Sequence, residues 1–536
     1  MKQLDCNVEL ISYEDTESFS SLILDYLKED VRLKPFYQHS PVTPDFKEII
    51  EQRKKIAVDR RLLVSELQSQ YKNLEISEKV AQNIQQLGDE NTFTICTAHQ
   101  PNLFTGYLYF VYKILHAIKL SQYLKARFPH YHFVPVYYMG SEDNDLEELG
   151  TVHTGDNTYR WQTSQTGAVG RMRTDDLAPL MEEVTNNLGT NEYAREIIRL
   201  IKEAYLNHPD IQSATACLVN ALFGEYGLVT IIADTPGFKR AILPVMKDDL
   251  INETSFKIVS GTIGEISKHY HVQASPREIN LFYLEDQLRE RIVKEEDYWR
   301  VLNTEIKFTR NELEAELESH PERFSPNVIL RGILQETILP NIVFIGGGGE
   351  LSYWMELKEL FIHFKVPYPL LMLRCSALWV DSKSKQRLEK VGLAPKDLFQ
   401  STETLINGFV EKNTQNHLVL KKEYEQIEKL YAELDKKAAG IDVTLRASAA
   451  AEKKKSMISI GKLEHKFLRA EKKKFAWQTE LIRNVKNELF PHHHLQERWE
   501  NLLPFYATYG PGFIETVFQA IDPTNKKFTI ISCEVR

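Results

Sequence analysis

The stretch TFTICTAHQPNLFTGYLYFVYKIL, residues 92–115, decides the fold class. It begins with a short apolar run that has strand character. A helical pattern follows, in which apolar residues recur at three- and four-residue steps: Leu108, Val111, Tyr112, Leu115 and Ile118. The next apolar run, residues 132–139, is typical of a buried strand. The order strand, helix, strand predicts a βαβ unit and a parallel sheet.

Further apolar runs extend this predicted sheet. Residues 228–234, 338–345 and 368–374 have strand character, and a helical pattern at 350–364 lies between the last two. We therefore expect an α/β core over about residues 85–380, with insertions near 160–225 and 255–325. Residues 1–90 read as mostly helical.

The region between Pro395 and Pro491 has a different pattern. It contains no further proline and only three glycines. From Leu420 to Leu445 apolar residues alternate steps of four and three without a break. A second run from Ile460 to Leu481 has the same spacing, but Lys474 interrupts it. This pattern predicts two long helices that form a coiled-coil arm. We expect three regions: an α/β core with a helical N-terminal segment and insertions (1–382), the arm (383–490), and a segment that returns to the core (491–536).

The composition excludes several classes of protein. With 43% hydrophobic and 26% charged residues, the 536-residue chain has an ordinary soluble globular composition. Its net charge of −9 argues against general nucleic-acid binding, since no basic excess is available to displace counterions from phosphates. No apolar run approaches the ~18 residues that a membrane span needs. The N-terminus does not resemble a signal peptide, so we expect a cytoplasmic protein.

The cysteines and histidines give no metal or disulfide pattern. Five cysteines are scattered without a CxxC pair: Cys6, Cys96, Cys217, Cys375 and Cys533. This spacing favours free thiols in a reducing compartment, with no disulfide framework. Three adjacent histidines at 492–494 have no second ligand group at metal spacing, so no metal site is expected.

The loop after the first predicted strand is one candidate site. His99 and Gln100 come at the strand's carboxyl end, where open α/β sheets place ligands. A helix that begins near Thr105 and Gly106 would leave N–H groups free for an anion. Alternatively, Pro101 and Gly106 only shape a turn, and spacing alone gives both interpretations equal weight. No GxxxxGK[ST] motif occurs, so a Walker-type nucleotide site is excluded at the motif level.

An acidic loop, GSEDNDLEELG at 140–150, follows the second predicted strand. It concentrates five carboxylates: Glu142, Asp143, Asp145, Glu147 and Glu148. Such a cluster could hold an ammonium group, a sugar hydroxyl or a hydrated Mg²⁺. Composition alone somewhat favours the alternative, a solvated loop that caps the next helix.

A glycine run, GGGGE at 346–350, lies between a predicted strand and a predicted helix. Gly346, Gly347, Gly348 and Gly349 let the backbone approach a ligand closely and present N–H groups to an anion. Its place between strand and helix favours a ligand role over a ligand-free turn.

Five stretches share a likeness to one family, in the right order and over most of the chain: TAHQPNLFTGYLYFVYKI, GSEDNDLEEL, PREINLFYLEDQLRERI, FSPNVILRGILQETILPNIVFIGGGGELSYWMELKELF and LQERWENLLPFYATYG. Together they resemble the BshC family, the cysteine-adding enzymes of bacillithiol biosynthesis. The chain departs from the family pattern at Ala98–His99, where Gly-Gln is usual, and at Tyr107 and Gly348, where proline is usual.

The resemblance implies a fold and an activity. The fold is a Rossmann-like core similar to class I aminoacyl-tRNA synthetases and nucleotidylyltransferases, with inserted connecting elements and a coiled-coil arm for homodimerisation. The activity joins L-cysteine to glucosaminyl-malate by an amide bond, in the last step of bacillithiol formation. The alternatives are an ATP-dependent ligase or nucleotidylyltransferase acting on another amino-sugar conjugate, and a non-catalytic dimeric nucleotide-binding protein.

Candidate roles follow from joining the resemblance to the residues. Amide formation needs an activated carboxylate, so ATP or ADP is a candidate nucleotide, although no cofactor follows from the residues themselves. The candidate catalytic residues are His99, Gln100, Lys113 and Asp143. The candidate substrate-binding residues are Thr105, Gly106, Asp145, Glu147, Tyr353 and Arg374, of which Arg374 would pair with a malate carboxylate. Gly346, Gly347, Gly348 and Gly349 are the candidate nucleotide- or anion-binding residues.

Overall fold

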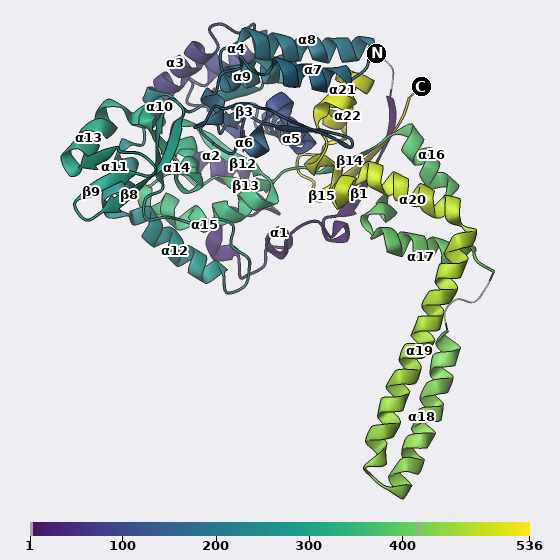
Figure 1. Ribbon diagram of the computed structural model, residues 1–536. Coiled ribbons are helices and arrows are strands. Elements are labelled where there is room, and N and C mark those ends of the chain that lie inside the picture. Colours follow the sequence, from purple (N-terminus) through teal and green to yellow (C-terminus); the bar gives the residue numbers. More distant parts are fainter. Residues whose placement is uncertain (1–3, 416–419, 536) are drawn as a thin grey trace. The chain divides into compact units, whose positions relative to one another are not determined.

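The computed structural model describes residues 4–415 and 420–535 (Figure 1). The chain forms two compact units. The larger runs to Trp379 and resumes at His494, and the smaller is Val380–His493. Within the described residues, no helix is long and apolar enough to cross a membrane.

A five-stranded parallel sheet lies at the centre of the larger unit. Its strand order is β13-β12-β2-β3-β6. The strands are β2 (Thr92–His99), β3 (His132–Met139), β6 (Val229–Ile232), β12 (Asn341–Gly346) and β13 (Leu370–Leu373). The predicted Rossmann-like parallel sheet is therefore confirmed. The chain adds strands on one side of β2 and then on the other, so a topological switch point lies between β2 and β12.

Helix α5 (Leu108–Arg127) connects β2 to β3. The predicted apolar stripe of this helix, from Leu108 to Ile118, is buried in one cluster with Tyr137 and Met139 of β3. On the side of the helix that faces β2, Ala117 and Leu120 share a second buried cluster with Phe93 and Ile95. The helix begins later than the sequence indicated, at Leu108 instead of near Thr105–Gly106. The reason is the backbone: Phe104, Thr105 and Gly106 have φ values of 52°, 76° and 64°, which a right-handed helix does not allow.

Two insertions lengthen the core. The first follows β3 and contains α6 (Leu146–Leu149), the hairpin β4 (Thr151–Thr154) and β5 (Asn157–Arg160), and helices α7 (Ala178–Asn186), α8 (Glu192–Asn207) and α9 (Ile211–Phe223). The second begins after β6 with helices α10 (Pro236–Arg240), α11 (Leu243–Asn252) and α12 (Thr254–Ile266).

An antiparallel sheet of order β10-β9-β8-β7-β11 completes the second insertion. Its strands are β7 (Leu281–Glu285), β8 (Leu288–Glu295), β9 (Tyr298–Val301), β10 (Lys307–Thr309) and β11 (Phe324–Pro326). Helix α13 (Arg310–Ser319) precedes β11, α14 (Val328–Ile338) leads into β12, and α15 (Gly348–Phe364) follows it.

The two ends of the chain pair with each other. β1 (Leu4–Ser12) runs antiparallel to β15 (Lys527–Val535), and β15 also pairs with β14 (Ala377–Val380). The mostly helical prediction for residues 1–90 was therefore wrong for residues 4–12, whose strand partner is β15. Four α-helices follow: α1 (Ser21–Leu27), α2 (Phe46–Lys54), α3 (Arg60–Gln70) and α4 (Glu78–Gln86). The C-terminal helices α21 (Leu502–Tyr509) and α22 (Pro511–Ala520) precede β15.

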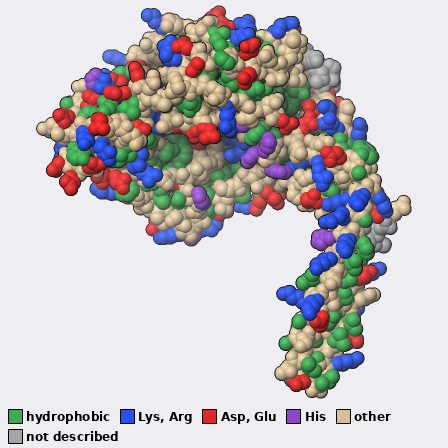
Figure 2. Space-filling view, in the orientation of Figure 1, with side chains coloured by type: hydrophobic (Ala, Val, Ile, Leu, Met, Phe, Trp, Pro, Cys, Tyr) green, Lys and Arg blue, Asp and Glu red, His purple; other side chains and the backbone are tan. Residues whose placement is uncertain are grey.

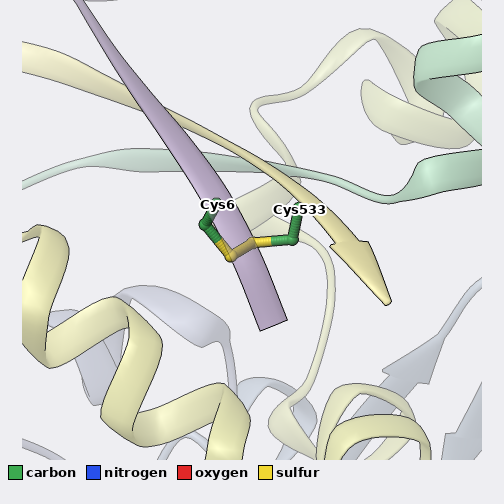
Figure 3. The surroundings of a disulfide bond; sticks show 2 residues. All are labelled: Cys6 and Cys533. Atoms are coloured by element: carbon green, nitrogen blue, oxygen red, sulfur yellow. A yellow bond between two sulfur atoms is a disulfide. The ribbon is translucent and has the colours of Figure 1, made fainter. Parts of the chain in front are cut away.

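A disulfide joins Cys6 of β1 to Cys533 of β15 (Figure 3). The expectation of free thiols was wrong for this pair. The two residues are 527 positions apart, but the strand register sets them directly opposite, with a Cα–Cα distance of 4.1 Å. Local cysteine spacing carries no information about such a pairing. Cys96, Cys217 and Cys375 are free.

The smaller unit is helical: α16 (Ser382–Lys390), α17 (Thr402–Asn413), α18 (Lys421–Ile441), α19 (Leu445–Lys474) and α20 (Ala476–Leu489). The two long helices α18 and α19 form an antiparallel hairpin, which confirms the predicted arm (Figure 1). The seam expected to continue through Leu445 breaks before it, because α18 ends at Ile441. Asp442 then accepts a hydrogen bond from the N–H of Thr444 at 2.8 Å and shapes the turn.

Candidate functional site

A cavity of about 520 Å³ opens at the carboxyl ends of the parallel strands. Ala98, His99 and Gln100 at the end of β2 line it, as do the loops after β3, β12 and β13. It therefore occupies the topological switch point, where open α/β sheets bind ligands. On the face of the larger unit in Figure 2, basic, acidic and histidine side chains gather around a hollow.

The cavity carries more positive than negative side chains. Five cationic side chains line it: Lys113, Arg289, Arg331, Arg374 and Arg498. The carboxylates in its lining are those of Asp143 and Glu350. Five cations against two anions favour an anionic ligand, because low-dielectric walls strengthen such a field.

His99 is a buried imidazole at the wall of this cavity. Its ring packs against Phe110 and Tyr109, with centroids 5.2 and 5.3 Å apart. Its Nε2 atom has no hydrogen-bond partner among the described residues. Burial, together with Lys113 and Arg374, lowers the pKa of His99 well below its usual 6.5. The ring is therefore neutral near neutral pH, and its buried Nε2 has no partner among the described residues.

Lys113 of α5 ties β2 to the start of α15. Its Nζ donates to the carbonyl of Ala98 at 2.8 Å and lies 2.5 Å from Oε2 of Glu350. Burial lowers the pKa of Lys113, and Glu350 opposes that change. The same Glu350 oxygen accepts the N–H of Gly347 at 2.8 Å. The lysine charge is thus already paired within the protein, so its main effect is to hold this wall together.

Gln100 and Asp143 join the loops after β2 and β3. Gln100 donates to Asp143 at 3.2 Å, and Arg331 lies 3.9 Å from the same carboxylate oxygen. Burial would raise the pKa of Asp143, but Arg331 and Arg289 outweigh it and lower that pKa. Asp143 is therefore ionised and can bind an ammonium group.

The glycine run forms the end of β12 and the first turn of α15. Gly347, Gly348 and Gly349 line the cavity, whereas Gly346 is buried inside the strand. The N–H groups of a first helical turn have no partner within the helix. A Cβ on Gly347 would lie 3.6 Å from Nε of Arg374, an ordinary van der Waals contact, which places this glycine next to the arginine. Because Glu350 accepts the N–H of Gly347, the backbone donors offered to an anion in the cavity are those of Gly348 and Gly349.

Arg374 follows β13 and is almost fully buried. It donates to Glu497 at 2.7 Å, and to the carbonyl of Cys375 and the hydroxyl of Ser376 at 2.9 Å each. Burial alone would lower the pKa of Arg374, but the nearby charge of Glu497 outweighs burial and raises that pKa. The guanidinium therefore stays charged. Nearby, Tyr353 of α15 also lines the cavity, and burial raises the pKa of its hydroxyl.

Besides Gly346, four candidate residues from the sequence do not line this cavity: Thr105, Gly106, Asp145 and Glu147. The carbonyl of Gly106 accepts from Asn501 at 2.7 Å, and the N–H of Leu108 donates to the carbonyl of Glu500 at 2.8 Å. The first N–H of α5 is thus bound by the protein itself. Asp145 caps α6 and Glu147 is exposed, so binding roles for these four remain predictions without a contact to the cavity.

Three arginines of the cavity were not singled out by sequence reasoning. Arg289 comes from β8, Arg331 from α14, and Arg498 from the segment before α21. Arg289 lies over the ring of Phe282 at 3.9 Å, and burial, with Arg331, lowers its pKa to about 10. All three lie inside stretches that resemble the BshC family, but no local pattern shows that they face one cavity.

Comparisons with known proteins point to one family over nearly the whole chain. The family model of the bacillithiol biosynthesis BshC N-terminal Rossmann-like domain matches residues 6–375, and that of the BshC C-terminal coiled-coil domain matches residues 377–533. A Flavobacterium johnsoniae protein named "Putative cysteine ligase BshC" is 40% identical over 526 residues, covering 98% of this chain and 99% of that protein. Proteins of the same name from Flavobacterium psychrophilum (38% identical; 98% and 99% covered) and Christiangramia forsetii (37%; 97% and 98%) are also similar.

Proposed function

This chain belongs to the BshC family of bacillithiol biosynthesis, and from that premise we propose that it is a ligase that joins L-cysteine to glucosaminyl-malate. The bond formed is an amide between the cysteine carboxyl group and the glucosamine amine, in the last step of bacillithiol formation. The observation that supports this most is the excess of cationic side chains in a cavity at the topological switch point.

The charges of glucosaminyl-malate complement those of the cavity. The malate part carries two carboxylates. Arg331 has one ion pair, at 3.9 Å, and neither Arg331 nor Arg498 donates a side-chain hydrogen bond to a described residue. We assign these two guanidinium groups, with Arg374, to carboxylate binding. Asp143 is assigned to the glucosamine ammonium, because it is the ionised carboxylate beside Gln100.

The reaction needs an activated carboxyl group, since a carboxylate and an ammonium do not condense at neutral pH. We propose that ATP activates the cysteine carboxylate and that its phosphates bind the N–H groups of Gly348 and Gly349 at the start of α15. The amine nitrogen then attacks the carboxyl carbon, and the bond from that carbon to the phosphate-bearing oxygen breaks. His99 accepts the proton that the amine loses, because its ring is neutral and its Nε2 is unbonded.

We also propose that the coiled-coil arm mediates homodimerisation. Several large apolar side chains of α18 and α19 are exposed: Leu430, Leu434, Ile441, Leu445, Ile458, Leu463 and Phe467. A two-helix hairpin that exposes so much apolar surface is suited to packing against a second hairpin.

Turnover by the purified protein tests the function. ATP, L-cysteine and glucosaminyl-malate are supplied together, and product thiol is followed by mass spectrometry. We expect the product to form only when all three are present, and His99→Ala to lower turnover by about 100-fold or more through loss of the proton acceptor. His363→Ala, at an exposed histidine of α15, is the matched control and should keep wild-type turnover.

Several outcomes would contradict the proposal. Unchanged turnover in His99→Ala, Asp143→Asn and Arg374→Ala would exclude this cavity as the active site. Absence of product under every condition, together with tight ATP binding, would instead favour a non-catalytic nucleotide-binding protein. Product from a different amino-sugar conjugate, but not from glucosaminyl-malate, would assign the protein to another ligase reaction.

A further inference from the structure

A short segment from the C-terminal part of the chain contributes one residue, Arg498, to the lining of the cavity. We call residues Gln496–Asn501, with the sequence QERWEN, the C-terminal clamp. It comprises the short 3-10 helix η9 (Gln496–Arg498) and the three residues before α21. Its polar side chains bond β14, Arg374, the β4–β5 hairpin and the loop after β2. None of the candidate roles above uses the clamp except that of Arg498.

The first end of the clamp is bound to β14. The side-chain amide of Gln496 bonds the backbone of Trp379 twice. Its Oε1 accepts the backbone N–H at 2.9 Å, and its Nε2 donates to the backbone carbonyl at 3.1 Å. Glu497 is fully buried and accepts the N–H of Ala377 at 3.0 Å with Oε2. Its other oxygen, Oε1, accepts from Arg374 at 2.7 Å. Glu497 therefore has no oxygen left for a ligand, and it does not line the cavity.

The other end of the clamp is bound to the hairpin β4–β5 and to the loop after β2. Glu500 accepts the N–H of Gly155 at 3.0 Å. Asn501 donates to the carbonyls of Phe104 and Gly106 at 3.0 and 2.7 Å. With both ends held, Arg498 stands between them and lines the cavity.

The contacts of Arg374 explain why Glu497 matters for binding. Three of its N–H groups donate to Glu497, Cys375 and Ser376. Its Nε bonds no described residue, and a Cβ built on Gly347, which lines the cavity, would lie 3.6 Å from it. Without the charge of Glu497, a buried guanidinium would lose its counter-ion and turn toward other carboxylates. The cavity offers two, Asp143 and Glu350.

We infer that Glu497 is a positioning residue for substrate binding: it holds the guanidinium of Arg374 so that the Nε edge faces the cavity. This inference rests on the proposed function only where it names the substrate group, a carboxylate of glucosaminyl-malate. Glu497 itself touches no substrate. Its effect reaches the site through one ion pair, in the way that buried partners commonly orient binding groups.

Glu497→Gln tests this role against a matched substitution in the same clamp. Glutamine keeps the size of the side chain but removes the charge, so Arg374 loses its counter-ion. We expect the KM for glucosaminyl-malate to rise about tenfold or more, with the KM for L-cysteine within about twofold of wild type. Glu500→Gln is the control, because Glu500 is also buried in the clamp but bonds Gly155 instead of an arginine. It should leave both KM values near those of wild type.

A structural readout makes the test independent of turnover. In protein labelled at arginine, the Nε–H signal of Arg374 is identified by its loss in Arg374→Lys. We expect this signal to shift and broaden in Glu497→Gln and to stay in place in Glu500→Gln. An unchanged signal in Glu497→Gln would overturn the inference, as would equal rises in both KM values in both variants. If wild-type protein shows no ligase activity but the signal still moves, the proposed function fails and the positioning role stands.

Discussion

Burial decides the protonation of the histidines near the cavity. His99 and His116 are both buried, and burial lowers the pKa of each. His116 bonds two backbone groups, with Nε2 2.9 Å from the carbonyl of Pro523 and Nδ1 3.1 Å from the N–H of Cys375. Nδ1 therefore accepts and Nε2 donates, so the ring is held in one neutral tautomer directly beside Arg374. Its protonation would place a second positive charge next to that arginine.

The pH dependence of stability follows from His116. Its pKa is about 4 in the folded chain against an ordinary 6.5, so below pH 6.5 the unfolded chain binds the proton more readily. The stabilisation is complete above the ordinary pKa and is lost as the pH falls toward the folded pKa, by up to roughly 3 kcal/mol. Urea unfolding at a series of pH values should show a shallower acid-side loss in His116→Gln than in wild type. His363→Gln, at an exposed site, should keep the wild-type slope, and equal slopes in all three proteins would refute the assignment.

The sequence predicted those residues of the candidate site that lie at the carboxyl ends of the parallel strands. His99, Gln100, Asp143, Gly347 and Arg374 all follow strands of one parallel sheet, whose carboxyl ends meet at one edge. Strand prediction alone therefore brings them together. Strand prediction did not identify three arginines of the cavity: Arg289, Arg331 and Arg498. Their elements reach the cavity by packing of the insertion and of the clamp, and no periodicity along the chain records that packing.

At the scale of elements, apolar periodicity located the arm but not its turn. An unbroken seam of four- and three-residue steps describes the side of a helix, and it continues across Asp442 where the chain reverses. The reversal depends on one side chain, since Asp442 bonds both the N–H and the hydroxyl of Thr444 at 2.8 Å. The hairpin is then held by contacts across it, such as Asp435 with Arg446 at 2.9 Å.

The arm provides a test of dimerisation. Leu430 of α18 and Ile458 of α19 are 54% and 50% exposed, so both lie mainly outside the hairpin's own packing. Leu430→Glu combined with Ile458→Glu should leave the hairpin folded but convert the protein to a monomer in sedimentation experiments, because charge at a buried interface is costly. Lys429→Glu, at an adjacent exposed position, should remain a dimer. A doubly substituted protein that still sediments as a dimer would place the interface elsewhere.

At the scale of the whole molecule, the two ends of the chain close the larger unit. β1 and β15 pair over nine residues, from Leu4 with Val535 to Ser12 with Lys527. The pairing continues into β14, which follows Arg374, and the clamp binds that same strand. The site therefore depends on segments from both termini as well as on the parallel sheet.

The disulfide between Cys6 and Cys533 should make stability depend on redox conditions. Linking residues so far apart restricts the unfolded chain, which stabilises the folded one by up to about 5 kcal/mol. A reductant should therefore lower the Tm of wild-type protein. The double variant Cys6→Ser, Cys533→Ser should have the lower Tm from the start and should not respond to reductant. A wild-type Tm that is insensitive to reductant would show that this bond does not contribute.

The sequence by itself determined the parallel sheet, the loops at its carboxyl edge and the two long helices of the arm. Each of these depends on periodicity or on residue types within a short window, because a strand or helix must place its apolar side chains at its own repeat. Only the tertiary structure decided the pairing of β1 with β15, the Cys6–Cys533 bond, the three additional arginines and the ion pair of Arg374 with Glu497. Those depend on contacts between residues more than a hundred positions apart or on separate elements, and such contacts are set by packing instead of by local pattern.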